Sequence, residues 1–437
     1  MQTLIPRYIY QLPKKFIVAI FVLYFAEIIF GGPGSWSMEY FNVNLRFTFF
    51  ALVCTTLLLN ALIKSRTLRM LDLMIFIIGI LSFIFWIFIL PVIYGIKLSY
   101  SIIDGTPFFS MFLLTFLFVI NIIKQKKEEI SLYKKICKFV FILSIISAVM
   151  HLTIYGLLRF FSESTYKIVY IVNNFFDPNY TGGIFVGLMP DDSYRVFWAS
   201  SIFLTYGLYR SIGKIFDKIN IHSIVLLLIF LMAFIVTQTR SFILAIPIAL
   251  VFSFAMNFFI RKRSYSLNIL LIIFTICLVT ITFFLIIFLS PDAIRFLGLL
   301  REDSDIFRYI QIPSLLDSWY QSIFFGRGFG AEASVVRSAL APFSYEMSIL
   351  ALYMKVGILG IFFMSLYFIY VIKSLLPSLD LIVSKRKEYI FLLSLIFSSI
   401  FIFNTNPYLS NSVGVGFALL CCMEVARISF ADPISSP

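Results

Sequence analysis

Apolar runs long enough to cross a bilayer recur along this chain, and they constrain its fold more than any other feature. Of the 437 residues, 61% are hydrophobic and 13% are charged, and a mean hydropathy of +0.98 excludes a soluble domain. Lipid offers no hydrogen-bond partners, so a run of about 20 apolar residues predicts a helix whose backbone bonds are all internal. The fold class that follows is all-α, a polytopic integral membrane protein.

The apolar runs predict about 12 transmembrane helices in one membrane domain, residues 1–437. The first run follows Arg7, Lys14 and Lys15 and lacks a small-residue cleavage site, so we expect a retained helix rather than a signal peptide. The predicted spans are 16–31, 46–63, 70–95, 107–123, 136–157, 194–212, 221–237, 241–260, 267–289, 345–373, 389–404 and 411–427.

Basic residues between the spans indicate the orientation, because cytoplasmic loops carry an excess of Lys and Arg. Such residues gather in 124–138, 261–263 and 385–387. We therefore expect both termini in the cytoplasm and two large loops outside, 158–193 and 290–344. Within the second loop, apolar residues at helical spacing predict a helix lying on the membrane surface.

The predicted outer side carries mostly arginine, whose planar guanidinium is the side chain best suited to bind phosphate. Arg195 opens a predicted span, Arg240 lies between two apolar runs, and Arg308 and Arg327 lie in the second loop. Taken one at a time, these arginines are also consistent with interfacial anchors or solvated side chains.

Glu346 precedes eight largely apolar residues and therefore lies at the membrane edge. A partly desolvated carboxylate there suits a proton acceptor; the alternative is a helix-start residue that interacts with the helix dipole. No His, Cys and carboxylate cluster has metal-ligand spacing, and no P-loop or dinucleotide fingerprint occurs, so we predict no metal and no cofactor. Without a basic soluble domain, nucleic acid is excluded as a partner.

Taken together, these motifs resemble the superfamily of O-antigen polymerases and O-antigen ligases. The resemblance covers roughly 195–375 and depends on the order and spacing of short motifs. These are Thr239-Arg240-Ser241, Arg308 through Trp319 to Phe325-Gly326-Arg327-Gly328, and Tyr345-Glu346 followed by Gly357-Ile358-Leu359-Gly360. In the ligase branch a histidine followed by Asn typically occupies the position of Tyr345 and Glu346, so the departure favours the polymerase branch.

The resemblance implies a GT-C-like membrane glycosyltransferase architecture in the bacterial inner membrane, with the active site facing the periplasm. It implies undecaprenyl-diphosphate-linked oligosaccharides as donor and acceptor, membrane lipids as surroundings, and a chain-length regulator protein as a further partner. Arg195, Arg240, Arg308 and Arg327 would bind the diphosphate. Glu346 would accept a proton, and Tyr345 would position the sugar.

Two other functions remain open from the sequence. The first is an O-antigen ligase that transfers finished polysaccharide to lipid A core. The second is a flippase for lipid-linked oligosaccharides, in which arginines line a central cavity. A flippase predicts charged residues inside helices, whereas Glu27 and Asp72 lie nearer the helix ends and most polar residues fall in the two outer loops. The polymerase is therefore favoured.

Overall fold

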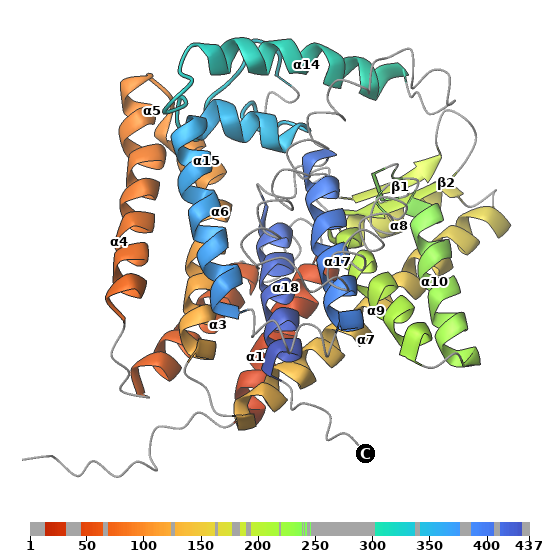
Figure 1. Cartoon of the computed structure of the whole chain (residues 1–437). Coiled ribbons are helices and arrows are strands. Elements are labelled where there is room, and N and C mark those ends of the chain that lie inside the picture. Colours follow the sequence, from red (N-terminus) through yellow and green to blue (C-terminus); the bar gives the residue numbers. More distant parts are fainter. Residues whose placement is uncertain are drawn as a thin grey trace, which may run out of the picture.

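The structure, a computed structural model, describes residues 14–31, 45–63, 69–123, 127–161, 165–176, 184–188, 194–217, 220–237, 239, 241–242, 245, 302–336, 341–375, 386–405 and 411–430. Over these residues the chain is mostly helical, with one small sheet (Figure 1). In its first half the helices are α1 (Lys14–Phe30), α3 (Leu45–Ile63), α4 (Met70–Ile84), the π-helical turn η1 (Phe85–Ile89), α5 (Leu90–Ile93), α6 (Leu98–Ile123), α7 (Lys127–Phe160) and α8 (Thr165–Phe176). In its second half they are the 3₁₀ turn η3 (Ala199–Ile202), α9 (Phe203–Asp217), α10 (Ile221–Thr237), α14 (Glu302–Tyr320), α15 (Ser348–Leu375), α17 (Arg386–Thr405) and α18 (Ser412–Phe430).

Five helical segments among the described residues are long and apolar enough to cross a membrane. They are Met70–Ile93, Leu98–Ile122, Ser131–Phe160, Ser348–Leu375 and Ser412–Ser429. Shorter apolar helices cover Leu45–Ala61, Ile221–Thr237 and Phe391–Ile400. The protein is therefore a mostly helical chain with several candidate membrane spans. The predicted spans 241–260 and 267–289 lie outside the described residues, apart from three positions at the start of the first.

The helix predicted over 194–212 is wrong at its start. Residues Tyr194–Trp198 form strand β2, which pairs antiparallel with β1 (Ile184–Leu188), and α9 begins only at Phe203. Val196 and Trp198 are buried while the alternating residues Arg195 and Phe197 are partly exposed. This alternation fits a strand with one buried face, whereas an apolar run scored by length alone reads as a helix.

The bundle is held by a large apolar core to which α1, α6, α7, α9, α10 and α18 all contribute. Phenylalanine rings fill much of it: Phe203 of α9 makes edge contacts with Phe25 of α1 and Phe417 of α18. The start of α1 and the end of α18 lie at the end of the bundle opposite α14 (Figure 1). Which side of the membrane that end faces stays a prediction.

Two helical segments lie across the other end of the bundle. α14 runs crosswise over the top of α15, and the first part of α15 lies beneath it (Figure 1). At Gly357 the backbone leaves helical geometry, with φ 64° and ψ −173°, and α15 then turns down along the bundle. The helix predicted within the second outer loop is thus present as α14, and its location on a membrane surface remains a prediction.

Candidate functional site

The glycine turn, residues 326–330, follows α14 and is wedged between helices. Gly326, Gly328 and Gly330 all have positive φ, which side-chain-bearing residues rarely adopt. Space is equally limiting, because a Cβ at Gly328 would lie 2.7 Å from the Pro91 ring and one at Gly330 would lie 2.6 Å from the Ser101 backbone nitrogen. Glycine is therefore required at these positions, because the turn packs directly against Pro91 and the Ser101 backbone.

The turn supplies the hydrogen bonds that α15 loses at its kink. The Arg327 and Gly328 amides donate to the carbonyls of Met354 (3.0 Å) and Lys355 (2.8 Å). On the far side of the kink, the Ile358 amide donates to the Ile323 carbonyl at 3.0 Å. A backbone N–H or C=O group without a hydrogen bond in an apolar environment costs several kcal/mol of free energy. The turn and the kink therefore stabilise each other as one unit.

Replacing Gly357 by alanine is expected to disrupt this unit. A Cβ there would overlap the backbone of Phe324 and Gly326, and the backbone conformation is one that glycine alone adopts readily. Strain of that kind costs about 1–3 kcal/mol before the overlap is counted, so we expect a clearly lower thermal unfolding midpoint for the purified protein. Gly156→Ala is the matched control, since nothing lies within 4 Å of a Cβ at that helical position. Equal midpoints for the two variants would contradict the role of the kink.

On its other side, the turn bonds to the π-helical stretch that precedes Pro91. Proline has no amide hydrogen, so carbonyls one turn earlier lose their usual donor. The Trp86 carbonyl accepts the Phe329 amide at 2.9 Å, and the Ile87 carbonyl accepts the Ser101 hydroxyl at 2.6 Å. The Trp86 indole in turn donates to the Phe325 carbonyl at 2.7 Å. The turn is thus fixed to both α4–η1 and α15.

A buried ion pair lies directly beneath the turn, and sequence reasoning missed it. Lys355 of α15 donates to Asp104 of α6 at 2.8 Å and also to the Phe343 carbonyl at 2.8 Å. The second Asp104 oxygen accepts the Gly330 amide at 2.8 Å. Both charged side chains are buried. An ionisable residue inside an apolar run indicates a paired or functional charge. Lys355 lies within the predicted span 345–373 and could have indicated this pair.

Tyr345 and Glu346 differ in their exposure. Tyr345 is buried, its hydroxyl accepts the Ala333 amide at 2.6 Å, and the Lys355 ammonium lies 5.9 Å from its ring centroid. Burial raises the pKa of Tyr345 to about 12, so it stays protonated near neutral pH. Glu346 is partly exposed. Of the two, Glu346 is the residue that a substrate can reach without displacing a packed ring.

Arg327 lies on the glycine turn with a partly exposed side chain. In the described part of the chain its side chain forms one long hydrogen bond, from Nη1 to the Glu332 carbonyl at 3.4 Å, and its guanidinium carbon lies 5.9 Å from the Tyr94 ring centroid. Its Nε is buried without a hydrogen-bond partner among the described residues. Arg327 is also close enough to influence the Tyr345 hydroxyl electrostatically. Nη2 of Arg327 has no hydrogen-bond partner in the described part of the chain.

Of the other three predicted arginines, the structure describes the side chain of Arg195 alone. Arg195 on β2 donates from Nε to the Thr237 carbonyl at 3.0 Å and from Nη2 to the Thr239 hydroxyl at 3.3 Å. It therefore lies beside the segment that leads to Arg240, which itself is outside the described residues. Arg308 is in α14, and its side chain is also outside the described part. Among the described residues, no contact joins Arg195 to the neighbourhood of Arg327.

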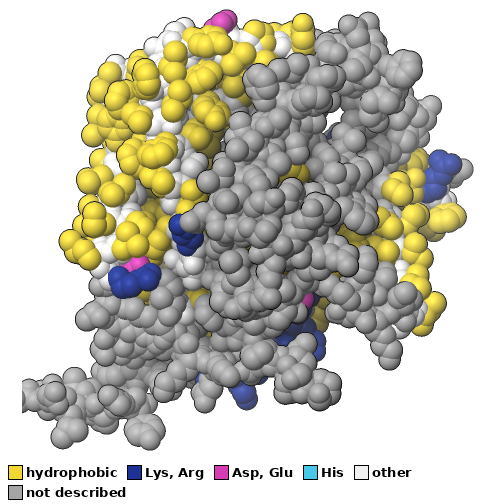
Figure 2. All heavy atoms as spheres, in the orientation of Figure 1, with side chains coloured by type: hydrophobic (Ala, Val, Ile, Leu, Met, Phe, Trp, Pro, Cys, Tyr) yellow, Lys and Arg dark blue, Asp and Glu magenta, His cyan; other side chains and the backbone are white. Residues whose placement is uncertain are grey.

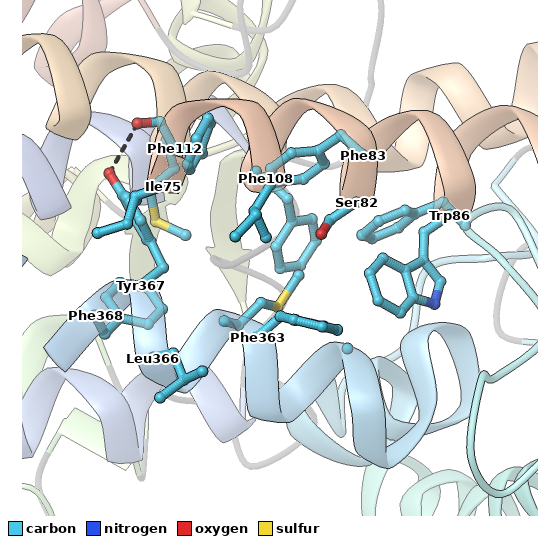
Figure 3. Close-up of a pocket in the computed structure, with 16 residues that line it drawn as sticks. Ile75, Ser82, Phe83, Trp86, Phe108, Phe112, Phe363, Leu366, Tyr367 and Phe368 are labelled. Carbon is cyan, nitrogen blue, oxygen red and sulfur yellow. Dashed lines mark hydrogen bonds between the residues drawn. The ribbon is translucent and has the colours of Figure 1, made fainter. Parts of the chain in front are cut away.

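An apolar cavity of about 320 Å³ lies between α4, α6 and the descending part of α15 (Figure 3). Trp86 and Phe329 line it, and these two residues also bond to each other through the backbone in the glycine turn. The remaining lining is almost entirely apolar and includes Phe83, Phe108, Phe112, Phe363 and Met364. Since Phe329 is two residues from Arg327, the cavity adjoins the turn that carries this arginine.

Comparisons of the chain with protein-family models, with curated proteins and with solved structures find no match.

Proposed function

We propose that this chain is a polysaccharide polymerase that joins oligosaccharide repeat units carried on undecaprenyl diphosphate. One observation carries the proposal: Arg327, whose Nη2 has no hydrogen-bond partner in the described part of the chain, lies on a rigid turn that adjoins an apolar cavity. A polyprenyl-diphosphate-linked sugar has matching parts, a long apolar chain attached to a dianionic diphosphate. Arginine recognises such oxygens with paired donors.

Each part of the donor has a proposed place. The first isoprene units occupy the cavity lined by Phe112 and Phe363, where burial of apolar surface is favourable. The diphosphate lies at the glycine turn against Arg327. Arg195, Arg240 and Arg308 remain predicted ligands of the same diphosphate, and the bonds of Arg195 to the segment before Arg240 support treating those two as neighbours.

The reaction needs no nucleotide, because the diphosphate already activates the sugar. The acceptor hydroxyl oxygen attacks the anomeric carbon, the bond from that carbon to the diphosphate oxygen breaks, and undecaprenyl diphosphate leaves with the bonding electron pair. Arginines preorganised at the surface stabilise the charge that develops on the leaving group. The acceptor's proton passes to the carboxylate of Glu346 as the new glycosidic bond forms.

The proposed function is tested by the surface polysaccharide of a strain that lacks this chain. Separated on a gel, the polysaccharide should show single repeat units on the lipid core, because export and ligation remain intact while chain extension stops. Bare core would contradict the proposal and assign the chain to ligation or flipping. A normal ladder of chain lengths would exclude all three functions.

Replacing Arg327 by lysine should weaken polymerisation although the positive charge is kept. Lysine is a point charge and cannot make two parallel contacts to a diphosphate. A hydrogen bond to a charged group contributes about 1.5–3 kcal/mol, so the loss of one corresponds to a ~10–100-fold lower rate. The rate is measured with purified protein and lipid-linked repeat units. Arg159→Lys, at an exposed position at the end of α7, is the control; equal rates for both variants would remove Arg327 from the site.

A further inference from the structure

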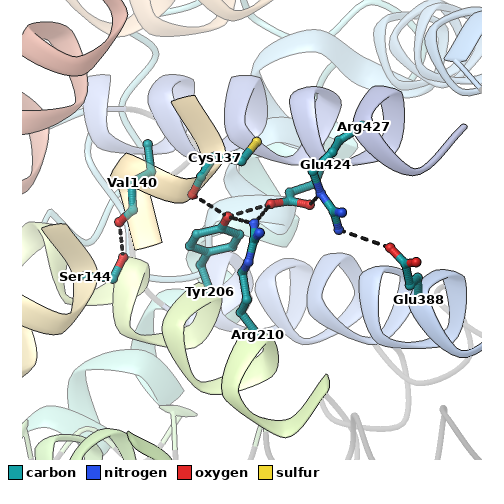
Figure 4. Close-up of polar contacts among 8 residues, drawn as sticks. All are labelled: Cys137, Val140, Ser144, Tyr206, Arg210, Glu388, Glu424 and Arg427. Atoms are coloured by element: carbon teal, nitrogen blue, oxygen red, sulfur yellow. Dashed lines mark hydrogen bonds and ion pairs between the residues drawn. The ribbon is translucent and has the colours of Figure 1, made fainter. Parts of the chain in front are cut away.

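A network of charged side chains joins three helices toward the end of the bundle opposite α14. Glu424 of α18 pairs with Arg210 of α9 and with Arg427 at 2.6 Å, and Arg427 also pairs with Glu388 of α17 at 3.2 Å (Figure 4). Tyr206 donates to Glu424 at 2.5 Å. The network contains two guanidinium groups and two carboxylates, so its charges balance internally.

Two lysines lie next to this network, and their positive charges are not neutralised by its carboxylates. The ammonium of Lys214, one turn after Arg210 on α9, lies 4.3 Å from the ring centroid of Phe141, and the Arg210 guanidinium carbon lies 5.7 Å from the same centroid. Lys138 is one turn before Phe141 on α7 and is exposed. Neither lysine forms an ion pair with a carboxylate in the described part of the chain. Lys138, Arg210 and Lys214 together form the cation cluster.

The positive charges of the cation cluster act on Lys214. Partial burial lowers the pKa of this lysine, and the neighbouring charges of Arg210 and then Lys138 lower it further. The Phe141 ring offsets part of this, because a cation over an aromatic face is attracted to the ring. An anion that bridges the two lysines would remove the remaining repulsion.

The surroundings of the cluster indicate which anion fits. Lys138 is followed on α7 by Phe139, Ile142 and Ile146, all of them exposed large apolar side chains. A soluble anion would satisfy the lysines alone. A phospholipid satisfies both features, since its phosphate reaches the lysines while its acyl chains cover the apolar face of α7.

We propose that Lys138 and Lys214, supported by Arg210, bind the phosphate of an anionic phospholipid at this end of the bundle. The site lies outside the residues assigned to the proposed reaction and does not depend on that reaction. Bound lipid would link α7 and α9 at a place where no described side chain bridges the two lysines.

The test uses the full chain purified in a neutral detergent, titrated with phosphatidylglycerol, with phosphatidylcholine or with inorganic phosphate. Lipid adducts are counted by native mass spectrometry and the thermal unfolding midpoint is followed in parallel. Wild-type protein should bind and be stabilised by phosphatidylglycerol alone. The Lys138→Gln, Lys214→Gln double variant should bind it ~30-fold more weakly, because each basic side chain near an anionic lipid contributes about fivefold.

Two further variants keep the result interpretable. Lys134→Gln with Lys135→Gln removes the same charge from exposed positions earlier on α7 and should bind like wild type. Lys138→Arg with Lys214→Arg keeps the charges and should also retain binding. If the Lys138 and Lys214 glutamine variant binds phosphatidylglycerol as tightly as the Lys134 and Lys135 control, the site is wrong. Equal stabilisation by inorganic phosphate or by phosphatidylcholine would overturn the anionic lipid as its ligand.

Discussion

Replacing Asp104 by alanine is expected to destabilise the protein strongly. The change leaves the Lys355 ammonium buried with only the Phe343 carbonyl, and it removes the acceptor of the Gly330 amide. Breaking one partner of a buried pair costs about 3–5 kcal/mol. Thermal unfolding of the purified protein should therefore shift to much lower temperature, and polymerisation should fall with it because the glycine turn loses its anchor.

Two controls distinguish the effect of an unpaired buried charge from nonspecific destabilisation at this position. Asp104→Leu combined with Lys355→Met removes both charges and should recover much of the lost stability, since well-packed apolar pairs often replace buried ion pairs at little cost. Glu388→Ala breaks a more exposed pair with Arg427 and should cost only about 0–1 kcal/mol. If Asp104→Ala proved no worse than Glu388→Ala, the ion pair would have no special role.

Replacing Glu346 by glutamine should abolish chain extension while the protein still folds. Glutamine keeps the shape and hydrogen-bonding capacity of glutamate but cannot accept the acceptor's proton. General-base assistance contributes a factor of ~10²–10⁴, so the rate of repeat-unit addition should fall by that amount. The measurement is polymer length and yield from lipid-linked repeat units, at matched levels of folded protein.

Glu332→Gln provides the matched control for this prediction. Glu332 is exposed in the segment that follows the glycine turn, so losing its charge should leave the rate close to wild type. A Glu346→Gln protein that retained more than about a tenth of wild-type polymerisation would have lost less than general-base assistance provides. Glu346 would then be a structural residue at the start of α15, and another carboxylate would have to be the base.

Sequence patterns located most helices but not every change of backbone direction. Runs such as 46–63, 221–237 and 389–404 correspond closely to α3, α10 and α17, because length and hydrophobicity suffice to specify a helix in lipid. The strand at 194–198 was missed, since its pairing with β1 is a tertiary contact. The kink at Gly357 was also missed, because it depends on bonds to residues in a different part of the chain.

A transporter is expected to carry charged residues inside its helices, and the sequence indicated few of them. In the structure, Asp104, Lys355 and Glu424 are buried on helices. Each of them pairs with an opposite charge from another helix. Burial and pairing cannot be read from composition, because they depend on which faces of distant helices meet. The candidate residues Arg327 and Tyr345 were found from the sequence, whereas the pair that supports them was not.

The bend in α15 determines the depth at which the glycine turn would lie in a membrane. Only the part after the bend, residues 358–375, runs along the bundle, and at about 1.5 Å per residue it rises about 27 Å. That nearly matches the hydrocarbon thickness of ~30 Å, so residues 348–356 and the glycine turn would lie level with the lipid phosphates of one leaflet. A lipid-linked substrate diffusing in that leaflet already carries its diphosphate at this height. It could reach Arg327 by moving sideways within the membrane plane, without being lifted out of the bilayer or drawn into it.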